Sequence, residues 1–323
     1  PEQTAEQARL AQVLPGVAME ECRSFASYVR GAVAQMRSGE QNFTLANNGA
    51  LLPVSIARRV IDTVKDICPI YAGADKYKVK GTLKLPTYNP KDGHDITVAY
   101  ADEFTELTAD AGAFGSIDLG GYLVGALSLI GRSLINNSDI DLTAFVVQKM
   151  AEKIAEFLER EFLNGDGSKH CTGALSTTNT IKSGSATAIT TDDLIDLQAR
   201  VKQAYQGGAV WTMHPDTWTA IKKLKDQNGR YLVQDDFTQA FPYRLLGKPV
   251  ELSDNMPKIG SGKKAVLYGD YKGLSANLRE DISMEVLREK YATMHAIGIV
   301  AWFEVDCKVA EPQKLATLET SAS

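Results

Sequence analysis

The side chains that most often do chemistry, histidine and cysteine, are few in this chain and far apart. The histidines are His94, His170, His214 and His295, and the cysteines are Cys22, Cys68, Cys171 and Cys307. No histidine has a second ligand at the i, i+4 spacing of a helical metal site, and no cysteine pair has CxxC spacing. His170 and Cys171 are adjacent, so they cannot easily hold one ion on regular backbone. We therefore expect no metal and no cofactor, and reduced thiols in a cytoplasmic setting.

Two further stretches resemble ligand-binding loops but lack residues that the binding motifs require. A phosphate loop of the form GxxxxGK[ST] around Gly260–Lys264 would need Gly at 257 and Ser or Thr at 264, where the chain has Pro257 and Lys264. A calcium loop starting at Asn164 would need Glu at its twelfth position, which is Leu175. No GxSxG nucleophile motif is present. A soluble α/β hydrolytic enzyme stays open as an alternative, because catalytic residues need not form local motifs.

The charge and composition of the chain limit the kinds of molecule that it is expected to bind. The chain has 323 residues and a net charge of −5, without a cluster of Lys and Arg. Tight nucleic-acid binding needs such a cluster to displace counterions, so direct DNA binding is not expected to be its main task. No run of 18 apolar residues occurs, so we expect no membrane span.

One long helix, residues 140–163, is predicted to organise the fold. Apolar residues recur at steps of three and four and form one stripe: Val147, Met150, Ala151, Ile154, Leu158 and Phe162. Glu156 and Arg160 have the i, i+4 spacing of a side-chain pair on the charged side. The helix is expected to end at Asn164-Gly165, with Gly165 in the left-handed conformation.

The pattern then predicts a long hairpin over residues 76–110. Tyr77, Val79, Leu83 and Leu85 alternate with lysines in one arm, and the return arm carries Ile96, Val98 and Tyr100 between polar and acidic residues. Opposite charges across the two arms would favour their pairing. A two-stranded hairpin is marginal in water, so its apolar face must lie either on its own domain or on another subunit.

The rest of the chain suggests a discontinuous first unit with a second unit inserted. Residues 114–135 read as strand that leads into the long helix. A helix–strand–helix series starts at Thr190 and continues through strands near 273–279 and 282–287, which indicates a compact α/β unit. Strands at 293–305 and 307–315 are expected to return to the first unit.

Three stretches together resemble the major capsid proteins of tailed bacteriophages, the phage capsid family with the Hong Kong 97-type fold. They are EREFLNGDG at 159–167 followed by GAL, VWTMHPDTWTAIKKLKDQNGRYL from Val210, and LLGKPVELSDNMP at 245–257. The order and spacing match over about residues 45–318.

The resemblance implies an α+β fold with four parts. A peripheral (P) domain has the helix at 140–163 as its spine, together with a β-sheet. An α/β axial (A) domain is inserted in it, a β-hairpin called the E-loop projects from it, and an N-terminal arm precedes it. The corresponding ranges are 1–48 for the N-terminal helical extension and arm, 49–75, 111–189 and 289–323 for the P domain, 76–110 for the E-loop, and 190–288 for the A domain.

The same resemblance implies a structural protein, not an enzyme, that self-assembles as pentamers and hexamers into an icosahedral head in the host cytoplasm. The head would enclose double-stranded DNA without sequence-specific binding, and portal, scaffold or protease, and decoration proteins would be further partners. An encapsulin-type shell protein shares the fold and is the main alternative. The implied interface residues are at the E-loop tip: Lys84, Tyr88, Asn89, Lys91 and Asp92. The implied structural residues are at the end of the spine helix: Leu163, Asn164, Gly165, Asp166 and Gly167.

The founding member of the family cross-links an E-loop lysine to an asparagine with the help of a glutamate. In the matching strand this chain has Lys290 near the asparagine position and Ile297 near the glutamate position. We therefore expect no autocatalytic cross-link.

Overall fold

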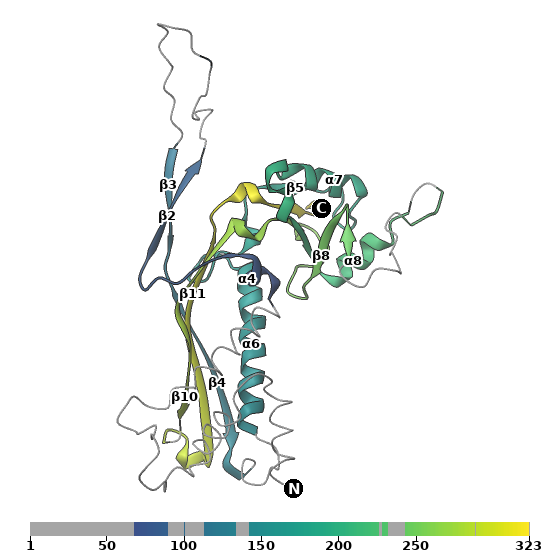
Figure 1. Ribbon diagram of the computed structural model, residues 1–323. Coiled ribbons are helices and arrows are strands. Elements are labelled where there is room, and N and C mark those ends of the chain that lie inside the picture. The colour runs from purple at the N-terminus through teal and green to yellow at the C-terminus, as the bar shows by residue number, and fades with distance from the viewer. Residues whose placement is uncertain are drawn as a thin grey trace, which may run out of the picture.

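The computed structural model describes residues 68–89, Tyr100, 113–133, 142–225, 228–231, 243–287 and 289–322. Three parts are visible in Figure 1: a column formed by helix α6 beside long strands, a compact unit at one end of this column, and a hairpin that projects past that end. Within the described residues, no helix is long and apolar enough to cross a bilayer.

Helix α6 (Leu142–Asn164) has 23 residues, which at 1.5 Å each gives a length of about 34 Å. All six residues of the predicted stripe are buried, with side chains no more than 7% exposed. They pack with strand residues in one apolar core. The prediction of this helix and of its buried side is confirmed.

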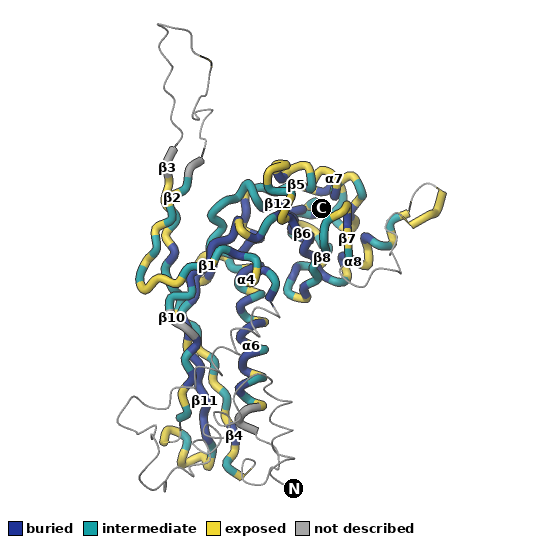
Figure 2. The backbone as a smooth tube through the Cα atoms, viewed as in Figure 1, coloured by how far each residue is buried: buried dark blue, intermediate teal, exposed yellow. Residues whose placement is uncertain are grey.

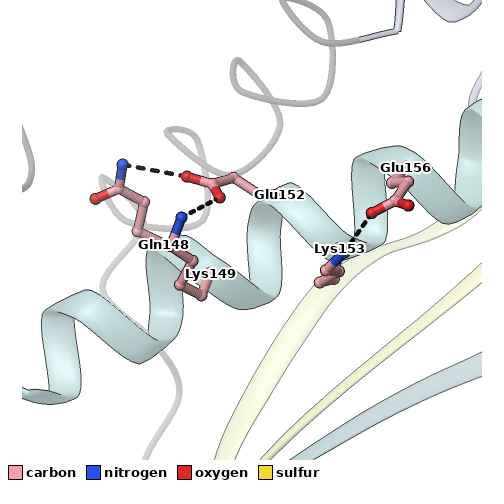
Figure 3. Close-up of polar contacts among 5 residues, drawn as sticks. All are labelled: Gln148, Lys149, Glu152, Lys153 and Glu156. Atoms are coloured by element: carbon pink, nitrogen blue, oxygen red, sulfur yellow. Dashed lines mark hydrogen bonds and ion pairs between the residues drawn. The ribbon is translucent and has the colours of Figure 1, made fainter. Parts of the chain in front are cut away.

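The opposite side of α6 is charged. Lys149 Nζ lies 2.7 Å from Glu152 Oε2, and Lys153 Nζ lies 2.6 Å from Glu156 Oε2 (Figure 3). Glu156 thus pairs with Lys153 instead of the predicted Arg160, whose guanidinium lies over the Phe157 ring. Exposed pairs differ little in energy, so sequence spacing alone does not select the partner.

A four-stranded sheet, here called the long sheet, covers the buried side of α6. Its order is β1-β10-β11-β4, with β1 parallel to β10 and the other neighbours antiparallel. The bounds are β1 (Asp75–Tyr77), β10 (Leu274–Leu287), β11 (Ala296–Val309) and β4 (Tyr122–Gly131). In this part of the molecule, Figure 2 shows buried residues along β11 and α6.

Two strand assignments made from the sequence are wrong. Residues 274–287 are one strand of the long sheet and not two strands of the compact unit, because Ala276, Ile282 and Met284 pack into the core beside α6. Conversely, the last strand, β12 (Leu315–Glu319), lies in the compact unit. Alternating apolar residues show that a segment is a strand, but they do not show which sheet it joins.

The compact unit is a six-stranded sheet of order β5-β12-β9-β6-β8-β7 with helices α7 and α8 packed on it. Its elements are β5 (Thr180–Lys182), α7 (Thr191–Arg200), β6 (Val210–Met213), α8 (Pro215–Lys222), β7 (Arg244–Leu245), β8 (Lys248–Leu252), β9 (Lys264–Gly269) and β12. Helix α7 begins with a capping box in which Thr190 and Asp193 satisfy each other's backbone amides. A helix starting here was predicted, as was the α/β character of the unit.

The hairpin pairs β2 (Leu83–Asn89) with β3 (Ala113–Leu119). The return arm predicted at Ile96–Tyr100 lies outside the described residues, apart from the exposed Tyr100. The strand opposite β2 is therefore 113–119, which the sequence had placed in the P domain. Lys84 lies opposite Asp118, which is not in the arm for which opposite charges were predicted.

The remaining described helices are short. They are α4 (Pro69–Gly73) and the 3₁₀ helices η2 (Ala174–Ser176), η3 (Gln203–Gly208), η4 (Tyr271–Gly273), η5 (Ala292–Met294) and η6 (Pro312–Lys314).

Candidate assembly surfaces

The predicted stop of the long helix is a tight loop that folds back on itself. The amide of Gly165 donates to Glu161 O at 2.9 Å and completes the last helical turn. The Gly173 amide donates to Gly165 O at 2.9 Å, and Asp166 forms a β-bridge with Thr172. Leu163, at the centre, is fully buried. The residues after the helix are thus fixed by backbone hydrogen bonds.

Glycine is needed at two positions of this loop for different reasons. Gly167 has φ of +73°, whereas Gly165 is not in the left-handed region, so the conformation predicted for Gly165 is wrong. Gly165 is instead required by space, because a Cβ there would lie 2.1 Å from Cys171 O. A glycine motif in sequence does not distinguish these two causes.

The stop also joins the column to the compact unit. Asn164 Nδ2 donates to Asn255 O at 2.7 Å, and Asn255 Nδ2 donates to Glu159 Oε2 at 2.7 Å. Thr172 N donates to Cys307 O on β11 at 2.8 Å. The residues at 163–167 therefore lie at a junction of three elements.

A second polar contact reinforces this junction. Tyr271 OH donates to Glu251 Oε2 at 2.6 Å and lies 2.5 Å from Thr212 Oγ1. Burial raises the pKa of the Glu251 carboxyl, the Tyr271 hydrogen bond lowers it, and the nearby charge of Glu159 raises it further. The net pKa is above its usual value, so the charged form of Glu251 is disfavoured in the fold.

Three of the cysteines and histidines have environments that suit a structural role. Burial raises the pKa of the Cys68 thiol to about 12 and raises that of Cys307 well above its usual range, so neither is a ready thiolate. His214 caps helix α8 by accepting a hydrogen bond from the Asp216 amide at 2.9 Å. In the parts of the chain that the structure describes, no cluster of His, Cys, Asp and Glu could hold a metal ion.

Three of the five predicted interface residues lie on strand β2 of the hairpin, far along the chain from the helix stop. Lys84 is exposed on β2, and Tyr88 and Asn89 are at the end of the same strand. Lys91 and Asp92 lie outside the described residues. Figure 1 places the hairpin and the stop of α6 on different parts of the molecule, so the two predicted groups do not form one site.

The sequence reasoning missed an exposed apolar surface on the long sheet. Leu123, Leu127 and Leu129 alternate along β4 and are 61%, 52% and 48% exposed, and Trp302 on β11 is 41% exposed. Gly125 lies opposite Trp302 and has no room for a side chain, because its Cβ would lie 2.4 Å from Trp302 Cζ3. We call these four large residues the apolar face. The period-two pattern of YLVGALSLIG was the signal that could have identified it.

The two positions compared with the cross-linking residues differ in environment. Lys290 is exposed beside the Tyr291 ring, and Ile297 is buried in the core beside α6. The absence of a cross-link remains a prediction.

A family model described as the phage capsid family matches residues 48–320. Among solved structures, the capsid of a native GTA particle computed with C5 symmetry has a TM-score of 0.68 and 22% identity, covering 90% of this chain and 97% of that chain. The capsid protein of the empty GTA particle gives a TM-score of 0.67 at 22% identity, with 88% and 96% covered.

A more distant match is a structure from Microbacterium phage Oxtober96, with a TM-score of 0.59 and 13% identity over 90% of this chain and 98% of that chain. At these identities the structural matches establish the fold alone. No curated protein sequence matches the chain.

Proposed function

The chain belongs to the phage capsid family, and on that premise we propose that it assembles as pentamers and hexamers into an icosahedral head around double-stranded DNA. It is a structural component of the virion capsid and not an enzyme, so the hydrolytic alternative is wrong. The mixed α+β structure matches capsid proteins of the Hong Kong 97 type.

The observation that carries the proposal is a hairpin that projects beyond the rest of its own subunit (Figure 1). Strands β2 and β3 pair only with each other in the described part of the chain. Two-stranded sheets are marginal in water, so the hairpin needs a surface to lie on. The apolar face of the long sheet offers such a surface on a neighbouring copy, since exposed apolar patches mark contact sites.

Such a contact joins two different surfaces and is therefore heterologous. Heterologous contacts close into rings when the rotation between subunits permits it. Rings of five and six subunits are the units from which a closed icosahedral shell is built. The GTA capsids that match this chain were computed with five-fold symmetry, which supports rings of this kind here.

We assign the family's domains to the observed parts on the same basis. Helix α6 with the long sheet is the P domain, the compact unit is the A domain that clusters around the symmetry axes, and the hairpin is the E-loop. Portal, scaffold or protease, and decoration proteins remain the expected further partners. The net charge of −5 suits a wall that confines DNA without binding its sequence.

Electron microscopy of the purified protein, with its mass in solution, tests the proposal. Uniform hollow particles, or discrete pentamers and hexamers, are expected. A protein that stays monomeric or dimeric under all assembly conditions would contradict it. Copurification of a specific enzyme inside the particles would instead indicate an encapsulin-type compartment.

A sharper test changes the apolar face without changing the core. Leu127 is already 52% exposed, so Leu127→Lys is expected to leave the melting temperature of the free subunit nearly unchanged. The same variant places a charge on the proposed contact and is expected to lower the yield of shells. Normal shells from this variant would exclude the apolar face as a contact.

A further inference from the structure

Two buried polar side chains lie where the hairpin joins the long sheet. Asn277 on β10 and Asp306 on β11 are directly opposite each other in the antiparallel register. They are 0% and 2% exposed. Polar groups this deeply buried are costly unless they are hydrogen-bonded, so their partners indicate what they do.

Their partners are the backbone groups at the start and the end of the hairpin. Val79 N donates to Asn277 Oδ1 at 3.1 Å, and Asn277 Nδ2 donates to Val79 O at 3.4 Å. On the returning arm, Asn277 Nδ2 donates to Gly120 O at 3.2 Å, and Gly120 N donates to Asp306 Oδ2 at 2.8 Å. Both backbone polar groups of Val79 and of Gly120 are thus satisfied by two side chains.

These contacts replace strand pairing at the point where pairing stops. Strand β1 ends at Tyr77 and β2 begins at Leu83, so Val79 lies between the two sheets. Gly120 likewise lies between β3 and β4. An apolar pair at 277 and 306 could fill the core equally well, but it could not hold either backbone.

We propose that Asn277 and Asp306 form a clamp that fixes the direction in which the hairpin leaves the subunit. They are positioning residues, because they act through the backbone of the hairpin and not by touching a neighbour. The clamp itself follows from contacts within one chain. Its consequence, correct placement of the hairpin on the next subunit, rests on the proposed function.

The charges around the clamp explain why one member is an amide. Asn277 Nδ2 faces two carbonyl oxygens, so a carboxylate in its place would repel both of them and also Asp306. Burial raises the pKa of the Asp306 carboxyl, and the hydrogen bond from the Gly120 amide and the charge of Lys308 on β11 lower it in part. The charge of Asp306 in turn contributes to the raised pKa of Tyr122 on β4 and of Cys307 on β11.

Hydrogen exchange of the full chain tests the clamp. The exchange rate is measured in peptides that contain Val79 and Gly120. Asn277→Asp is expected to speed exchange at both sites by about tenfold at pH 8, the effect of one or two lost buried hydrogen bonds. At pH 5 the ratio to wild type is expected to fall toward one, because a protonated carboxyl can donate again. Ser283→Ala is the matched control, since it removes a side-chain hydrogen bond from β10 to Trp302 O without touching the hairpin.

Variants at Asp306 separate the clamp from general destabilisation. Asp306→Ala is expected to speed exchange at Gly120 more than at Val79, and Asp306→Asn, which keeps an acceptor, is expected to restore slow exchange at Gly120. These two variants decide the matter if Asn277→Asp does not fold. Equal acceleration in peptides from α6, or no change at Val79 and Gly120, would overturn the clamp.

Shell yield from the same proteins tests the consequence for assembly. Fewer or malformed shells from Asn277→Asp, with normal shells from Ser283→Ala, are expected. Normal shells despite fast exchange would overturn the positioning role while leaving the proposed function intact. If wild type itself forms no shells, the proposed function fails, and the exchange data still decide whether the clamp exists.

Discussion

Gly165 ends helix α6 in a space that admits only a hydrogen atom as a side chain. A methyl group there would lie 2.1 Å from Cys171 O and 2.6 Å from Glu161 O, both of which are backbone atoms held by hydrogen bonds. Backbone atoms cannot rotate away as a flexible side chain would. The stop of the helix and the β-bridge after it therefore depend on this residue.

We predict that Gly165→Ala lowers the free energy of unfolding by about 1–3 kcal/mol or more, the usual cost of overpacking. Urea unfolding of the free subunit measures it. Gly184→Ala is the control, because a Cβ at Gly184 meets no atom within 4 Å and its φ is not positive. Equal stability of the two variants would show that the loop can shift to accept a methyl group.

At the scale of the element, α6 is stabilised by the side it buries. We predict that Leu158→Ala, at a side chain 3% exposed, lowers the free energy of unfolding by about 2–5 kcal/mol. Phe145→Ala on the same helix, at a side chain 45% exposed, is expected to cost less than about 1 kcal/mol. Similar losses from both would mean that the buried stripe does not hold the helix, and the same urea titration decides between these outcomes.

The elements that could be predicted from the sequence are those with a strong local pattern. The stripe of α6 repeats over several turns, and the capped start of α7 at Thr190 is a local hydrogen-bonding motif. Both are determined by residues within one or two turns of each other. The pairing of strands depends on residues that are distant in the chain. The sequence therefore did not predict that β2 pairs with 113–119 or that β10 belongs to the long sheet.

The candidate assembly surfaces also divide into features that the sequence predicted and features that it did not. The first arm of the hairpin and the helix stop were predicted because their residue types are locally distinctive. The clamp and the apolar face were missed, since each is formed by strands distant in sequence. A local signal for the clamp did exist, since Asn277 lies between the apolar residues Ala276 and Leu278, and Asp306 lies between Val305 and Cys307.

At the scale of the whole molecule, the junction between the column and the compact unit should respond to pH. The folded-state pKa of Glu251 is raised above its usual value of 4.5. A group of this kind stabilises the fold fully below its unfolded pKa, and that contribution is lost as pH rises through the folded pKa. Stability should therefore carry a penalty at neutral pH that is absent near pH 4.

We predict that Glu251→Gln removes this penalty. The unfolding free energy of the variant, relative to wild type, should rise as pH increases from 4 to 8, when both are measured by urea unfolding. Glu285→Gln, at an exposed position on β10, is the control. A rise for Glu251→Gln no larger than that of this control would mean that the Glu251 carboxyl is not disfavoured in the fold.

The hairpin should matter for the shell and not for the subunit. Leu85 and Ile117 lie opposite each other, so residues 86–116 can be replaced by an Asn-Gly turn that joins the two strands at that pair. We predict a subunit with an unchanged thermal midpoint and a failure to form closed shells by electron microscopy. Closed shells from this variant would remove the hairpin from the assembly contact.

The place of β12 in the compact unit has a consequence for synthesis on the ribosome. This strand lies between β5 and β9, and the Thr180 and Thr317 hydroxyls that meet across the β5–β12 pair are 137 residues apart in the chain. At about 5–20 residues per second, β5 waits on the order of 10 s for its neighbour. Until then the sheet of the compact unit is incomplete, so a nascent chain cannot present the finished surface of this unit to another subunit. Because β12 is close to the end of the described chain, the surface of the compact unit is completed only when nearly all of that chain has been made. Folding of the unit and polymerisation of the subunits are thereby separated in time.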